Sequence, residues 1–192
     1  EQVRYPFGYG LSYTSFTVTG THTDPLGFRS EVTNTGKHPG KAVVMLFVEK
    51  PCGVLGNPAR ELVAFGKTRL LNPGQSQSLS FSVTEYQLSS YDDSGITGHK
   101  SCYVLQQGAY RFYCGENVRD TQFIGDYMVP ELRVLRSLSE ACAPKKSFPI
   151  WANENGTPVR REASARTVDL RQRILDHLPK AVSQTGDQGI QL

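Results

Sequence analysis

The residue types that carry most enzyme chemistry are dispersed in this sequence. His22, His38, His99 and His177 are scattered through polar surroundings, and no Ser or Cys motif lies beside any of them. A catalytic triad needs a nucleophile, a base and an orienting acid that converge on one point. The spacing of the four histidines therefore predicts no such triad.

The conspicuous carboxylates also suit structural roles. Asp92 and Asp93 are adjacent, and we expect them to form a turn with solvated side chains. Glu61 comes at the start of an apolar run, where we expect a surface or interdomain ion-pair partner.

The cysteines, at positions 52, 102, 114 and 142, include no C-x-x-C pair, so their spacing does not predict a zinc site. Cys102 and Cys114 flank an expected hairpin, which would place them close together. They fit small buried apolar positions equally well. We favour reduced thiols and, on that ground, a cytoplasmic protein.

Charge and hydropathy exclude two classes of partner. The 192 residues hold 21 Lys and Arg against 18 Asp and Glu, and no basic run stands out before the C-terminal segment. This near-neutral balance argues against a nucleic-acid partner. No apolar stretch approaches the roughly 18 residues that a membrane span requires, so we expect no membrane partner.

The body of the chain has the alternation of half-buried strands. Phe16 and Val18 alternate with threonines, and Leu79 and Phe81 alternate with serines. The run from Ala42 to Val48 is apolar on both faces, which predicts a central strand with one face on the core and the other against another domain. We expect strands over 16–20, 28–32, 42–48, 62–66, 79–83, 102–105 and 109–115, the last two paired as a hairpin. Short strands at this spacing predict an all-β, immunoglobulin or fibronectin-III-like antiparallel sandwich.

Tyr110 follows Gly108 at the spacing of a tyrosine corner, in which a buried tyrosine hydroxyl bonds to backbone a few residues upstream. The alternative is an ordinary core aromatic, and both alternatives bury the ring.

The character of the sequence changes after about Pro144. We expect a loop over 153–158 and a helix over 168–178, with Thr167 as its cap and Pro179 as its stop. The apolar face of that helix would consist of Leu170, Ile174, Leu175 and Leu178.

The stretch from Tyr5 to Thr14, YPFGYGLSYT, resembles the YPFG-x-GLSYT signature of family 3 glycoside hydrolases. In that family the signature joins an α/β-sandwich domain to a fibronectin-III-like domain. Similarity to the family's fibronectin-III-like domain continues to about residue 135, with Cys102-Tyr103-Val104 where the family often has Trp-x-Val. The further matching segments are 32–36, 40–48, 58–65, 71–74, 90–92, 108–110 and 118–120.

The resemblance implies a domain organisation. Residues 1–14 would be the seam from a preceding α/β-sandwich domain, 15–143 the fibronectin-III-like sandwich, and 144–192 a connector with its helix near 168–178. A subset of the family has permuted domain order, with the catalytic barrel after the sandwich. We favour a connector into that barrel over an unrelated C-terminal segment, and expect the chain to be a piece of a larger enzyme.

The resemblance also implies a function. The parent chain would hydrolyse β-glycosidic bonds with retention of configuration, using carboxylates on the α/β-sandwich and barrel domains. No catalytic, cofactor-binding or metal-binding residue would lie in this segment, which would stabilise the arrangement of the catalytic domains. Its partners would be those domains, with carbohydrate bound only through the parent. The alternatives are a carbohydrate-binding or adhesion module and, less consistent with the opening motif, a free-standing interaction domain.

Four aromatics, Tyr5, Phe7, Tyr9 and Tyr13, crowd the seam. They would form either a sugar-stacking platform or a hydrophobic clasp between two domains. We favour the clasp, because alternation of aromatics with glycines suits domain docking.

Overall fold

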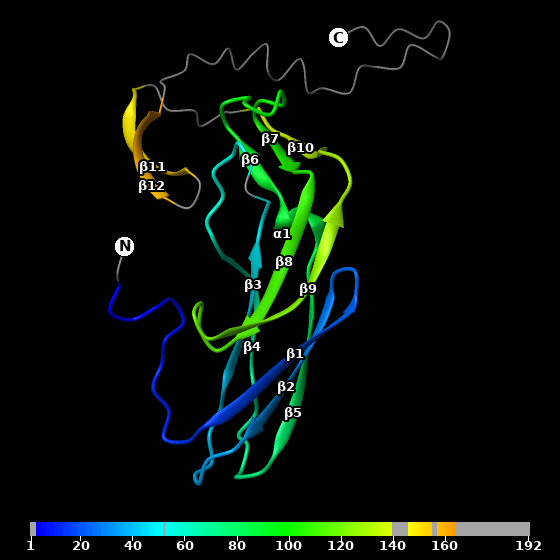
Figure 1. Ribbon diagram of the computed structural model, residues 1–192, viewed down its shortest axis with the longest axis vertical. Helices are drawn as coiled ribbons and strands as arrows, with labels where there is room; N and C mark the ends of the chain where they lie inside the picture. The colour runs from blue at the N-terminus through cyan, green and yellow to red at the C-terminus, as the bar shows by residue number, and fades with distance from the viewer. Residues whose placement is uncertain (1–2, 52, 140–145, 155–156, 164–192) are drawn as a thin grey trace, which may run out of the picture.

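Two layers of antiparallel strands form the body of the protein in the computed structural model, which describes residues 3–51, 53–139, 146–154 and 157–163 (Figure 1). One layer is a four-stranded sheet in the order β4-β3-β8-β9. The other layer consists of the sheet β1-β2-β5 at one end of the molecule and the sheet β10-β7-β6 at the opposite end. The antiparallel sandwich predicted from the sequence is confirmed.

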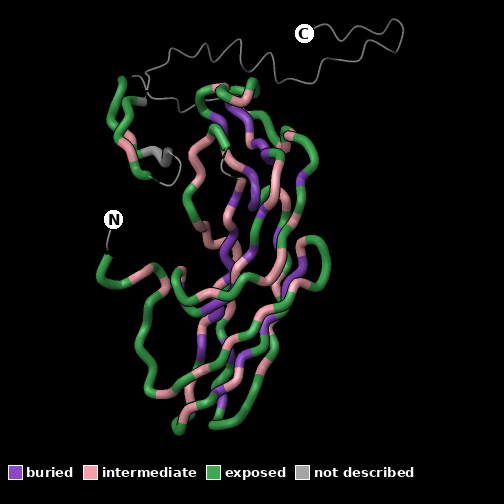
Figure 2. The backbone as a smooth tube through the Cα atoms, viewed as in Figure 1, coloured by how far each residue is buried: buried purple, intermediate pink, exposed green. Residues whose placement is uncertain are grey.

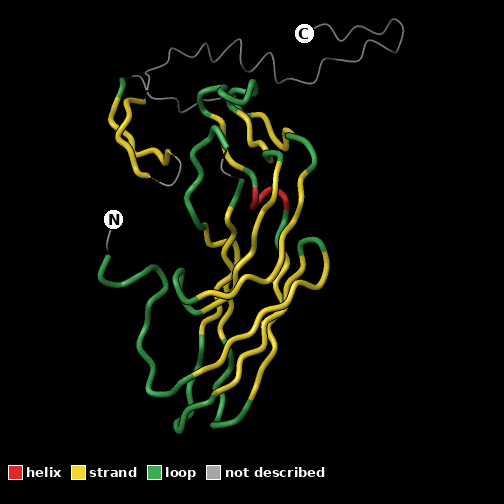
Figure 3. The backbone as a smooth tube through the Cα atoms, viewed as in Figure 1, coloured by secondary structure: helices red, strands yellow, loops and turns green. Residues whose placement is uncertain are grey.

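The strands account for most of the described chain, and the helix that interrupts them is a single turn (Figure 3). Their bounds are β1 Phe16–Asp24, β2 Gly27–Asn34, β3 Val43–Glu49, β4 Glu61–Lys67, β5 Ser76–Ser82, α1 Glu85–Leu88, β6 Ser90–Asp92, β7 Cys102–Leu105, β8 Gly108–Gly115, β9 Thr121–Val129, β10 Arg133–Ser137, β11 Phe148–Glu154 and β12 Thr157–Ala163.

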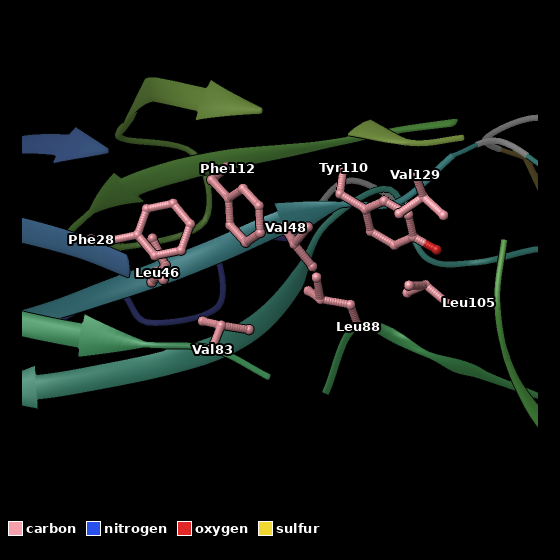
Figure 4. Close-up of a cluster of buried hydrophobic side chains, with 9 residues drawn as sticks. All are labelled: Phe28, Leu46, Val48, Val83, Leu88, Leu105, Tyr110, Phe112 and Val129. Atoms are coloured by element: carbon pink, nitrogen blue, oxygen red, sulfur yellow. The ribbon is translucent and has the colours of Figure 1, made fainter. Parts of the chain in front are cut away.

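The core lies between the two layers, and period-two alternation of side chains builds it. In β2 the buried residues Phe28, Ser30 and Val32 alternate with exposed Arg29 and Glu31. Buried residues follow the interior of the sandwich, whereas the N-terminal segment is mostly exposed (Figure 2). Among the described residues, the larger of two apolar clusters is drawn in Figure 4, and it contains Phe28, Leu46, Val48, Val83, Leu88, Leu105, Tyr110, Phe112 and Val129.

The hairpin predicted from β7 and β8 is wrong. β7 pairs with β6 and β10, whereas β8 pairs with β3 and β9 in the opposite layer. The connection crosses between layers at Gly108, whose φ of 130° is available to glycine but costly for other residues. A short glycine-containing connection fits a hairpin and a layer crossing equally well, so sequence spacing did not distinguish them.

The loop predicted over 153–158 is also wrong. β11 and β12 pair along their whole length, from Phe148 opposite Ala163 to Glu154 opposite Thr157. In the sequence, Asn155-Gly156 separates the two strands, and this dipeptide is among the strongest hairpin signals. The predicted helix over 168–178 lies outside the described residues, and the domain boundaries stay predictions.

Helix α1 was missed, although its start has a recognisable signature. Thr84 caps the helix by accepting from the Gln87 amide, and the Gln87 side chain in turn accepts from the Thr84 amide. This reciprocal capping box satisfies two donors that a helix N-terminus would leave free. The helix carries Leu88 into the core.

Candidate docking surface

The described residues contain no candidate metal centre, since no group of three or more His, Cys, Asp or Glu side chains among them could hold an ion. His22 lies in β1 and its ring stacks on Phe28 with centroids 4.9 Å apart, while His38 and His99 lie in two other segments. His177 is outside the described residues. No helix in the described ranges is long and apolar enough to cross a membrane.

The seam lies against the outer face of the four-stranded sheet. The Phe7 carbonyl accepts a hydrogen bond from the Val118 amide at 3.0 Å, and the Phe7 ring meets Phe47 edge-on at 6.3 Å. Gly8 has a φ of 85°, and a Cβ at that position would lie 2.6 Å from the sulfur of Met45. The backbone conformation at position 8 therefore favours glycine, and a Cβ there would also require the Met45 side chain to shift.

The seam also presents its aromatics to solvent. Tyr13 is 98% exposed, Phe7 is 61% exposed, and Tyr5 and Tyr9 are exposed although their rings are 4.9 Å apart. The seam therefore leaves much apolar surface uncovered. Large exposed apolar patches often mark sites of interaction with another protein or domain.

The outer face of the β4-β3-β8-β9 sheet continues this apolar surface. Cross-strand register places Phe65 beside Met45, and places Tyr113 between Phe47 and Phe123. Phe65 is 70% exposed, and Phe123 is exposed as well. The apolar outer face of β3 is what contact with another domain would need, and that contact stays a prediction. Phe47 itself is buried, so we call the seam together with Met45, Phe65, Tyr113 and Phe123 the docking surface.

Arg60 fixes one border of the docking surface. Its guanidinium lies 4.0 Å from the centroid of the Tyr113 ring, within cation–π range. The same group donates to the Val118 carbonyl at 2.9 Å and to the Thr121 hydroxyl at 2.6 Å. Arg60 thus holds the β8–β9 loop, which receives the seam, against the sheet.

Glu61 is an ion-pair partner, as expected, but inside the domain. Its carboxylate lies 2.8 Å from the Nζ atom of Lys50, whose side chain is only 3% exposed. Lys50 also donates to the Ser89 carbonyl at 3.0 Å. A buried ammonium needs such partners, and Glu61 supplies one of them.

The expectation for Asp92 is wrong, because its side chain is buried while Asp93 is exposed. The Asp92 carboxylate accepts hydrogen bonds from the backbone or side chains of Ser94, Gly95, Ile96 and Thr97. Burial acts to raise its pKa, but the donors led by Thr97 outweigh burial and lower the pKa below its ordinary value. Asp92 therefore organises the loop that follows β6.

The prediction of reduced cysteines is confirmed for the two cysteines that the structure describes. Cys102 and Cys114 are free and buried, and they belong to strands in opposite layers. Burial raises the pKa of the Cys114 thiol, with a smaller opposing effect of a Ser30 hydrogen bond. Both behave as small core residues.

Several aromatic side chains outside the seam are also exposed. Tyr86 and Tyr91 are exposed, and each ring lies about 5 Å from that of Tyr103, at 5.0 and 5.2 Å. Trp151 is 76% exposed on β11.

Comparisons with known proteins agree with this geometry. The Fibronectin type III-like domain family matches residues 42–118. The chain is 38% identical to a beta-glucosidase of Ruminococcus albus over all of its own length and 21% of the relative. It is 40% identical to beta-glucosidase A of Butyrivibrio fibrisolvens, covering 66% of this chain and 17% of the relative.

Solved structures give the same result. A beta-glucosidase from Paenibacillus barengoltzii superposes with a TM-score of 0.79 and 43% identity, over 96% of this chain and 22% of that one. Beta-glucosidase 3B from Thermotoga neapolitana, solved with alpha-D-glucose, gives a TM-score of 0.60 and 34% identity over 69% of this chain and 18% of its own. The chain spans about a fifth of the length of these relatives.

The sandwich fold and the family match together define a fibronectin type III-like domain. More particularly, the chain belongs to glycoside hydrolase family 3, in which it corresponds to the fibronectin type III-like region of the β-glucosidases.

Proposed function

We propose that this chain is a non-catalytic structural module that holds the catalytic domains of a larger family 3 β-glycosidase in register. The observation that carries the proposal is the docking surface, in which the exposed seam aromatics continue into Phe65 and Phe123 on the outer face of the sheet. Soluble proteins that act as monomers rarely expose a large contiguous apolar surface, so this surface indicates a partner domain.

The parent enzyme would hydrolyse β-glucosides or related β-glycosides with retention. Such enzymes need two carboxyl groups about 5–5.5 Å apart across the scissile bond. In this chain Asp92 holds a loop, Glu61 neutralises Lys50, and Glu85 binds Arg133 and Tyr127. The reacting carboxylates would belong to the other domains, so carbohydrate would reach this module only through the parent.

We also propose the permuted domain order for the parent, with the barrel after residue 192. Matches to the Ruminococcus albus and Paenibacillus barengoltzii enzymes cover 100% and 96% of this chain. Matches to the Butyrivibrio fibrisolvens and Thermotoga neapolitana enzymes cover 66% and 69%. A segment shared with only some relatives supports a connector specific to one domain order. The free thiols of Cys102 and Cys114 support a cytoplasmic parent.

Calorimetry of the intact parent enzyme tests the structural role. We expect the sandwich and the domain on its docking surface to unfold in one cooperative transition. Phe65→Glu places a charge in the interface and should split the sandwich from that transition. The matched control is Leu70→Glu, since Leu70 is also exposed but lies in the loop after β4. Equal thermograms for the two variants would contradict the proposal.

A further inference from the structure

The β11–β12 hairpin carries the side chain in this chain that is best suited to docking. Trp151 lies directly opposite Arg160 in the register, so both occupy one face of the hairpin. Phe148 and Ile150 lie on the other face, because neighbouring strand residues point to opposite sides. Trp151 is 76% exposed, and Arg160 is exposed beside it.

The hairpin is not part of the sandwich sheets. β11 and β12 pair with each other and form a separate two-stranded sheet (Figure 1). An isolated two-stranded hairpin is marginally stable in water, and stability usually requires further strands or a packing surface. Ile150 and Val159 are only half-buried, and Phe148 is exposed. Such a hairpin needs a second body against which to pack.

The comparison with a longer enzyme indicates what that body is. The Paenibacillus barengoltzii structure superposes on 96% of this chain, a share that exceeds the sandwich and extends into the C-terminal region. This chain is only 22% of that polypeptide. The matched region thus belongs to a polypeptide most of whose length lies outside the match, and the domains there are the available partners for the exposed face.

We infer that the β11–β12 hairpin is a second docking arm, whose Trp151 inserts into an apolar pocket on another folded domain of the same polypeptide while Arg160 pairs with a carboxylate at the rim. This inference rests on the proposed function. Tryptophan and arginine are the side chains that most often dominate binding energy at protein interfaces, and a planar indole loses little conformational entropy on docking. The arm lies outside residues 42–118, the part that the family profile matches.

Trp151 is the single tryptophan of the chain, which makes the first measurement specific. In the isolated 192-residue chain, its fluorescence should have the red-shifted emission of an indole in water and should be quenched freely by acrylamide. Blue-shifted, protected emission would show that this chain already covers Trp151 and would overturn the inference. Protection on addition of cello-oligosaccharides would also overturn it, in favour of a sugar platform.

Trypsin provides the second measurement, because Arg160 and Arg161 are cleavage sites within β12. Mass spectrometry would follow cleavage at this pair in the isolated chain and in the intact parent enzyme. Cleavage in the parent should be at least about tenfold slower, the factor that a modest hot-spot contribution confers. Trp151→Ala in the parent should recover most of the rate, and Trp151→Phe should preserve the protection. Tyr86→Ala, at an exposed tyrosine on α1, is the control that should change nothing.

The outcomes separate this inference from the proposed function. If Phe65→Glu uncouples unfolding in the parent but cleavage at Arg160 is as fast there as in the isolated chain, the structural role stands and the docking arm is wrong. If Trp151→Ala leaves the protection in the parent unchanged, another contact holds the hairpin and the inference also fails.

Discussion

The hydroxyl of Tyr110 closes a ring with the backbone of Gln106: it accepts a hydrogen bond from the Gln106 amide at 2.9 Å and donates one to the Gln106 carbonyl at 3.2 Å. The aromatic ring of Tyr110 is buried among Val48, Leu105 and Val129 (Figure 4). Burial raises the pKa of Tyr110 to about 12, so the hydroxyl keeps its proton at any ordinary pH. This tyrosine corner fixes the crossing from β7 to β8, so the tyrosine-corner interpretation of Tyr110 is confirmed over that of an ordinary core aromatic.

Tyr110→Phe should therefore destabilise the sandwich by about 1–3 kcal/mol, because it leaves the buried amide and carbonyl of Gln106 without partners. Urea unfolding monitored by circular dichroism would measure the loss. The matched control is Tyr113→Phe, since the Tyr113 hydroxyl donates to Glu49 near the surface and should cost only about 0.5 kcal/mol. Equal losses for the two variants would mean that the corner contributes no more than a surface contact.

Acid should destabilise the protein through Asp92. The folded-state pKa lies below the ordinary value of 3.8, so the carboxylate binds protons less readily in the folded chain than in the unfolded one. Its stabilising contribution is complete above the ordinary pKa and is lost as pH falls through the lower folded value. Asp92→Asn should flatten the fall of unfolding free energy below about pH 4. Asp93→Asn, at the exposed neighbour, is the matched control, and a slope that Asp92→Asn does not alter would contradict the assignment.

The sandwich could be predicted from the sequence because each half-buried strand alternates apolar residues on its core face with polar residues on its outer face. In β2, Phe28, Ser30 and Val32 are buried as expected. The layer to which a strand belongs is not encoded in its own alternation. Cys102–Leu105 and Gly108–Gly115 read as a hairpin for that reason, whereas packing of Tyr110 and the partners of β7 decide that they separate.

The docking surface was predicted in part. The seam aromatics and the run from Ala42 to Val48 indicated this surface. That run is apolar on both faces, and a strand with two apolar faces needs two packing surfaces. Phe65 and Phe123 were not predicted, because their exposure depends on which face of an edge strand is turned outward. Asp92 was missed for a similar reason: a pair of aspartates resembles a solvated turn until the donors around the first one are seen.

Gly8→Ala should release the seam from the sheet. A methyl group there would lie 2.6 Å from the Met45 sulfur, and the left-handed backbone would add roughly 1–2 kcal/mol of strain. Hydrogen exchange of the Val118 amide, which donates to Phe7, would report the release as faster exchange. Gly10→Ala is the matched control, since no atom lies within 4 Å of a Cβ at that position. Unchanged exchange in Gly8→Ala would mean that the seam is held elsewhere.

The isolated chain should show no glycosidase activity. A retaining mechanism needs two facing carboxyl groups, and the buried carboxylate Asp92 is saturated by donors within its own loop. Release of nitrophenol from aryl β-glucoside and β-xyloside would measure any turnover. Activity above the buffer rate that disappears when the protein is unfolded would contradict the proposed non-catalytic role.

The isolated chain should also bind sugars weakly, with no dissociation constant well below about 1 mM, which corresponds to about 4 kcal/mol. Sugar platforms present aromatic rings on a rigid exposed face, whereas the seam aromatics lie on a loop segment that is attached at Phe7 and Gly8. Tyr9 and Tyr13 are nevertheless exposed, so they are the residues by which the rival function can be tested. Titration calorimetry with cello-oligosaccharides and xylan fragments is the measurement, with Tyr9→Ala and Tyr13→Ala as the informative variants. Micromolar binding that either substitution abolishes would make the seam a carbohydrate platform, and the clasp between domains would then be the wrong assignment.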